Sequence, residues 1–108
     1  MIAIQPPALE LQDLKDLIYQ TLCEHEQLEI GVFPMTERVL TRRTEPCGIL
    51  FCLHGPRSVK FTAIWETDRN TVLFYGASGE RFHKLRLTKA PDLEDGIQKL
   101  ARMRSGNG

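Results

Sequence analysis

Residues 30–88 constrain the fold most, because short apolar runs alternate there with turns too short for a crossover. Residues 59–65 place apolar and polar side chains alternately, which is the period of a half-buried strand. Gly, Pro, Asp, Asn and Ser mark turns at residues 55–58, 67–70 and 76–79. An antiparallel strand can return through such a turn, whereas a parallel strand needs about a dozen residues or more. The sequence therefore predicts an antiparallel β-meander of four or five strands.

A helix is expected on each side of this meander. Between residues 8 and 27, Leu11, Leu14 and Ile18 recur at helical spacing, with acidic residues mostly on the other side. After the meander, Asp92 can cap a second helix over residues 93–104, which has acidic residues at its start and basic residues at its end. Both helices are amphipathic and must pack against the sheet.

Length and composition indicate one domain. The chain has 108 residues, 42% apolar and 26% charged, which is the ordinary balance of a globular domain. We expect a single α+β domain over residues 1–108 in two layers, with both helices on one sheet face. Residues 1–7, which contain two prolines, form an extended lead-in, and residues 105–108 a frayed tail.

The other face of the sheet, the second face, is more apolar than water favours. An antiparallel sheet with one wet face should alternate cleanly, but residues 47–54 and 71–75 do not. The sheet can curl so that a loop or the lead-in covers this face, or the face can meet a second copy across a two-fold axis. We expect a homodimer through the sheet. Its candidate interface residues are Leu50, Cys52, Leu73 and Tyr75.

Two cysteines and a histidine close together in the sequence raise the question of a metal site. Cys47, Cys52 and His54 lie close together, but structural zinc sites usually place ligand pairs on tight turns. Here the intervening residues read as strand interior, and buried hydrophobic thiols explain the cysteines better. We predict no metal and no cofactor.

Nucleophilic catalysis also lacks a candidate. Residues 76–79 differ from a nucleophile elbow in glycine spacing, and a strand follows them instead of a helix. Cys23 and His25 diverge by about 200° around a helix and cannot touch. Cys52 and His83 can meet across strands, although nothing in the sequence requires it. We predict no catalytic residue.

Charge is unevenly distributed although its total is zero. Residues 1–30 hold one basic and six acidic residues, a balance of −5, which leaves +5 on residues 31–108. If the first and last strands are neighbours, their basic residues form one patch suited to single-stranded nucleic acid. Otherwise these residues protect the sheet edges or contact an anionic protein. The candidate residues are Arg38, Arg42, Arg43, Arg81, Lys84 and Arg86.

The sequence shows neither a secretory signal nor an apolar run of membrane-spanning length. Three cysteines are an odd number, unlike the disulfide frameworks of small secreted domains. We therefore expect a cytoplasmic protein with reduced thiols.

These observations favour a non-enzymatic interaction module, dimeric through its sheet, that binds a protein or a peptide. The alternative is a small nucleic-acid-associated protein that uses the basic strands. A third possibility is an enzyme whose site has no local signature. The sequence identifies neither the partner nor the pathway.

Overall fold

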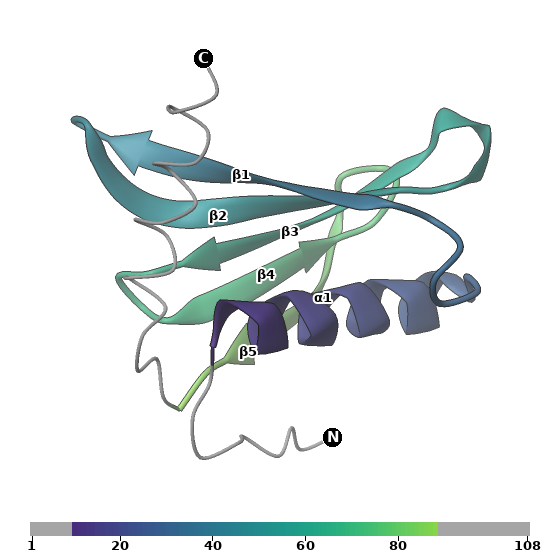
Figure 1. The fold of residues 1–108 in the computed structure, drawn as a ribbon, viewed down its shortest axis with the longest axis horizontal. Helices are drawn as coiled ribbons and strands as arrows, with labels where there is room; N and C mark the ends of the chain where they lie inside the picture. The colour runs from purple at the N-terminus through teal and green to yellow at the C-terminus, as the bar shows by residue number, and fades with distance from the viewer. Residues whose placement is uncertain (1–9, 89–108) are drawn as a thin grey trace.

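The computed structural model describes residues 10–88, which form one helix and a five-stranded antiparallel sheet (Figure 1). The strands lie side by side in chain order, so each is a hairpin partner of the next. This confirms the α+β class and the antiparallel meander. The elements are α1 Leu11–Glu26, β1 Met35–Arg42, β2 Glu45–His54, β3 Lys60–Glu66, β4 Thr71–Tyr75 and β5 Arg81–Arg86.

The predicted lead-in, the predicted helix at residues 93–104 and the tail lie outside the described residues. The prediction of two layers with both helices on one face therefore stays a prediction. Within residues 10–88, no helix has the length and apolar character needed to cross a membrane.

Local capping sets both ends of α1. The Glu10 and Asp13 side chains form a capping box, in which the Glu10 backbone N–H donates to Asp13 Oδ2 at 3.0 Å. At the other end, Gln27 adopts φ 56°, and its N–H donates to the carbonyls of Cys23 and Glu24. The predicted helix began near residue 8, which lies outside the described part, and the observed helix begins at Leu11.

The core lies between α1 and one face of the sheet (Figure 1). In β2, Ile49, Phe51 and Leu53 point to the helix side and are fully buried. Trp65, predicted as core, is 1% exposed. The other buried members of this core are Leu14, Ile18, Leu22, Cys23, Phe61, Ala63, Val72, Phe74 and Leu87.

The loose pattern of residues 30–43 predicts a first strand region that begins at Ile30, but this bound is wrong, because β1 begins at Met35. Gly31 adopts φ +91°, a conformation that breaks an extended strand. The Tyr19 hydroxyl on α1 accepts from Gly31 N–H at 2.9 Å and donates to the Phe33 carbonyl at 2.7 Å. These bonds hold the loop in place.

Two further strand bounds differ from the prediction. The chain turns at Arg43 and Thr44, whose φ values of 53° and 71° suit a two-residue hairpin turn. Consequently β2 begins at Glu45 instead of residue 47, and Arg43 lies in the turn, not on a strand. The sequence also predicts a last strand from about residue 80 to residue 88, and the observed β5 is shorter, spanning Arg81–Arg86.

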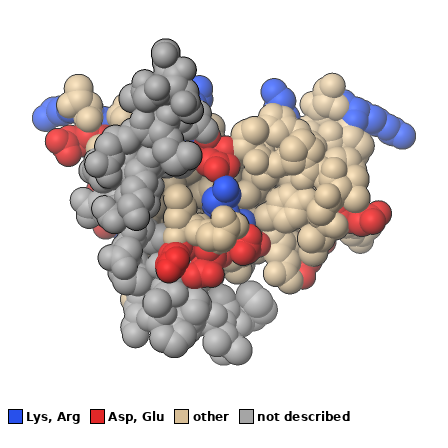
Figure 2. Space-filling model, viewed as in Figure 1, with Lys and Arg blue, Asp and Glu red and all other residues tan. Residues whose placement is uncertain are grey.

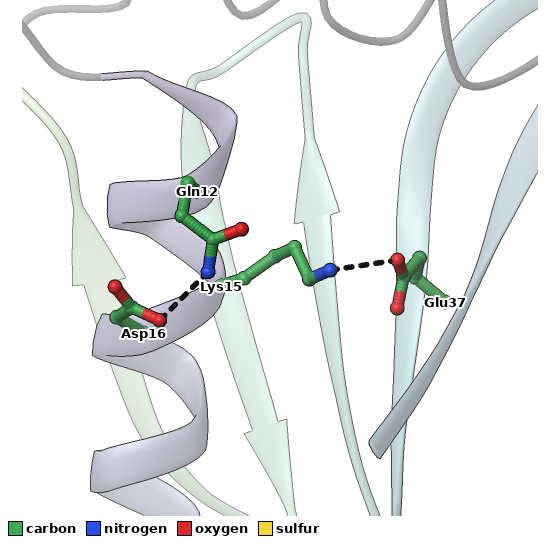
Figure 3. A network of polar contacts seen from close by, with 4 residues as sticks. All are labelled: Gln12, Lys15, Asp16 and Glu37. Carbon is green, nitrogen blue, oxygen red and sulfur yellow. Dashed lines mark hydrogen bonds and ion pairs between the residues drawn. The ribbon is translucent and has the colours of Figure 1, made fainter.

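A polar contact joins α1 to the edge strand β1. Lys15 Nζ donates to Glu37 Oε1 at 2.9 Å, whereas Gln12 and Asp16 contact each other within the helix (Figure 3). The Lys15 and Glu37 side chains are 29% and 16% exposed, so water screens this pair only in part.

We expect Glu37→Gln to lower the free energy of unfolding by about 1 kcal/mol, because the half-buried Lys15 ammonium loses its counter-charge. Urea denaturation followed by circular dichroism measures the loss. Gln12→Ala is the control, since it removes only an exposed contact and should cost less than about 0.5 kcal/mol. Equal losses in the two variants would contradict a role for the pair in holding β1.

Candidate protein interface

The sheet register aligns five side chains in a row across the second face, opposite α1. We call this the central row. It consists, from edge to edge, of Arg38, Leu50, Ile64, Leu73 and Lys84. Directly opposed side chains in antiparallel strands lie about 4.5–5.5 Å apart, so the row is continuous. Three aliphatic side chains therefore occupy the middle of this face, with one cation at each edge.

Two rows flank the central row. One is Thr36, Cys52, Thr62, Tyr75 and Arg81, and the other is Leu40, Gly48, Glu66, Thr71 and Arg86. Leu50, Cys52, Leu73 and Tyr75, the predicted interface residues, thus share one face with Ile64. All five are partly exposed, whereas the helix-facing residues of the same strands are mostly buried. No helix or strand among residues 10–88 covers them; their role as an interface stays a prediction.

The second face is hollowed on both sides of the central row. A hollow of about 440 Å³ is lined by Arg38, Leu50 and Lys60, among others. Another, of about 530 Å³, includes Arg42 and Ile64. Both hollows combine aliphatic surface with charged side chains. Glu37, which is paired with Lys15, also lines the first hollow, and Glu66 and Asp68 also line the second. The first hollow, with Arg38 and Lys60, can bind a partner carrying apolar and acidic groups.

Positive charge dominates the second face. Its strand positions carry one carboxylate, Glu66, and five cations, which are Arg38, Lys60, Arg81, Lys84 and Arg86. Among the described residues, none of these five forms an ion pair. Arg42, near this face, lies 3.6 Å from Asp68, with both side chains largely exposed. The candidate basic residues Arg38, Lys84 and Arg86 thus reach this face, and Arg43 lies in a turn.

The opposite side of the molecule is acidic. Figure 2 shows carboxylates gathered over α1, where Asp13, Asp16 and Glu24 are exposed. The charge imbalance of the sequence therefore separates into an acidic helix side and a basic second face.

The first and last strands are not neighbours, so their basic residues do not form a single patch. β1 and β5 lie at the two outer edges of the sheet, with three strands between them. The basic residues of the two strands therefore form two ridges separated by the aliphatic middle of the central row.

The three cysteines occupy different environments. Cys23 is fully buried, and Cys47 and Cys52 are partly exposed, so the prediction of buried thiols is wrong for these two. Burial raises the pKa of the Cys23 thiol, and a hydrogen bond with Tyr19 offsets part of the rise. Cys52 cannot meet His83, because His83 pairs with Phe74 on the helix side. Within residues 10–88, no three His, Cys, Asp or Glu side chains converge as metal ligands would.

Two residues of the second face were not singled out from the sequence, Ile64 and Lys60. Ile64 falls in the polar half of its strand's alternation, and only the register reveals that it lies between Leu50 and Leu73. The four-residue turn after β3 sets the Ile64–Leu73 pair, so hairpin counting could have found that contact.

No protein-family model matches this chain, and neither a curated protein nor a solved structure matches it.

Proposed function

We propose that the chain is a non-enzymatic interaction module that contacts a protein or a peptide through its second face. The observation that supports this proposal is the aliphatic middle of the central row, which is partly exposed although it lies at the centre of the sheet. Contiguous apolar surface on a folded domain usually marks a contact site.

The side chains available suit a reversible contact. Burying one aliphatic side chain completely contributes about 1.5–3 kcal/mol, and Leu50, Ile64 and Leu73 are already half-buried. Their remaining surface, together with that of Tyr75, supplies several kcal/mol before the cost of association. We therefore expect dissociation constants in the micromolar range, which correspond to a binding free energy of about 8 kcal/mol in magnitude.

The proposal is tested by selecting random 16-residue peptides, displayed on phage, against the full chain. We expect the selected peptides to bind Leu73→Glu about tenfold or more weakly than wild type, because a carboxylate would replace the apolar centre of the contact. Ser78→Glu, a matched change in an exposed turn residue, should leave binding unchanged.

Fluorescence anisotropy with labelled copies of the enriched peptides measures the affinities, and circular dichroism checks that both variants are folded. Peptides that bind Leu73→Glu as tightly as wild type would place the contact elsewhere and contradict the proposal.

We also propose the cytoplasm as the site of this module. The three cysteines support this location because all are free, as expected in a reducing compartment. The homodimer expected from the sequence would use the same face.

A further inference from the structure

We infer that the second face takes an acidic amphipathic segment of another protein, with carboxylates beside bulky apolar side chains. This inference rests on the proposed function and specifies the chemistry of the partner.

Charge is the first reason. Five cations and one carboxylate occupy the strand positions of this face, and no ion pair within residues 10–88 neutralises the five. A partner that brings carboxylates supplies the missing counter-charges. Complementary charges across an interface speed association and exclude wrong partners.

The placement of the cations is the second reason. Arg38 and Lys84 terminate the central row at its two edges, and the aliphatic triplet lies between them. Neighbouring strands are about 4.8 Å apart, so the four steps from β1 to β5 span about 19 Å. A helix is about 10–12 Å wide with its side chains. An apolar stripe over the triplet would therefore leave carboxylates on both flanks within reach of the edge cations.

The smaller hollow offers a specific position for one carboxylate. Arg38 and Lys60 line it together with Leu50 and Cys52. Glu37 also lines this hollow, but its carboxylate is already paired with Lys15. An acidic side chain that enters the hollow therefore meets two cations without a counter-charge of their own among the described residues, while its neighbours contact aliphatic surface. Charge-assisted hydrogen bonds of this kind are about twice as strong as neutral ones.

A second copy of the chain fits this surface less well. Pairing the second face with itself brings one basic surface against another, and Glu66 is the single strand carboxylate available to offset the repulsion. Like charges juxtaposed at an interface are costly. The exposed ridge of α1 is acidic, but it lacks the apolar side chains that would cover the triplet.

Single-stranded nucleic acid is also a poorer fit. Proteins that bind single strands on a sheet stack the bases on aromatic rings. The three rows of this face contain one aromatic side chain, Tyr75, and the middle of the central row is aliphatic. Its cations lie beside a surface that suits apolar side chains better than bases.

The peptide selection separates these partners. We expect the enriched peptides to combine several Asp or Glu residues with bulky apolar residues. Reversing both edge charges, with Arg38→Glu and Lys84→Glu in one chain, should weaken their binding about tenfold or more. Arg43→Glu is the matched control, because Arg43 lies in the β1–β2 turn, and it should change binding less than about twofold. Binding to wild type should also weaken as salt rises.

Each alternative result has a distinct meaning. Neutral or basic peptides whose binding is lost on Leu73→Glu would overturn the acidic partner while the interaction module stands. Failure to enrich any Leu73-dependent peptide would overturn both. A dimer sensitive to Leu73→Glu in sedimentation velocity at about 50 μM would assign the face to a second copy. Salt-sensitive binding of 20-nucleotide poly(U) or poly(dT), lost in the double charge reversal, would assign it to nucleic acid.

Discussion

Trp65→Ala is expected to lower the free energy of unfolding by about 3–5 kcal/mol, a large part of the stability of a domain this size. The side chain is 1% exposed and lies between Ile49 and Val72 on the helix-facing side of the sheet. Its indole N–H donates to Asn70 Oδ1 at 3.0 Å, and Asn70 Nδ2 donates to the Leu87 carbonyl at 3.2 Å. Alanine leaves a cavity and removes the partner of Asn70.

Trp65→Phe separates the packing of the ring from its hydrogen bond. Phenylalanine fills most of the volume but has no N–H, so we expect a smaller loss of about 1–2 kcal/mol. Urea denaturation followed by circular dichroism measures both variants. A loss below about 1 kcal/mol for Trp65→Ala would contradict the position of this residue at the centre of the core.

Gly48→Ala has the second large expected effect, because it should lower the free energy of unfolding by about 2–3 kcal/mol. Gly48 lies opposite Glu66 where β2 and β3 approach closely, and a β-carbon there would overlap the Trp65 carbonyl oxygen. This obstacle is backbone inside a sheet, so relief requires the two strands to separate. The added methyl group therefore strains the β2–β3 pairing that positions Ile64.

Gly76→Ala is the matched control for this prediction. The nearest atom to a β-carbon at Gly76 is a carboxylate oxygen of Glu80, at the end of a flexible side chain. That side chain can move away, so the cost should be much smaller. Thermal or urea unfolding compares the midpoints of Gly48→Ala and Gly76→Ala. Equal losses of stability in the two variants would show that the close approach of β2 and β3 at Gly48 does not determine the cost of the added methyl group.

The meander was predictable because its determinants are local. Residues 59–65 alternate apart from Ile64, and Thr67–Asn70 and Gly76–Gly79 carry ordinary turn residues. The apolar character of both faces of β2 and β4 was equally visible, since Leu50 and Leu73 break the alternation expected of a wet face. The observed strand order is that of sequential hairpins, as a meander with such short connections predicts.

The remaining features depend on contacts that the sequence does not display. Arg43 and Thr44 form a two-residue hairpin turn with positive φ, although Asn and Gly are the residues that usually mark such turns. The residues around Ile30 and Val32 alternate like a strand, but the Tyr19 hydroxyl holds the backbone of Gly31 and Phe33 in a loop. In the second of these places a tertiary contact overrides the local pattern.

The central row depends on register between strands that are distant along the chain. The Leu50–Ile64 pair forms across a loop with positive φ at Arg57 and Ser58, a geometry that residue types alone do not specify. The positions of Arg38 and Lys84 follow from the same register. The sequence therefore identified Leu50 and Leu73, and separately Arg38 and Lys84, as candidate residues, but it revealed neither Ile64 nor the single row that joins all five.

Thiol labelling of the Cys47→Ser chain, in sub-micromolar solution with N-ethylmaleimide, tests most directly whether the second face is accessible. Cys52 lies on that face and is partly exposed, whereas Cys23, on α1, is buried in the core and burial raises its pKa. We predict that mass spectrometry finds Cys52 modified while the chain is folded, and Cys23 modified only when urea unfolds it. Protection of Cys52 as complete as that of Cys23 would show the face to be covered already, and would contradict its use as a contact surface.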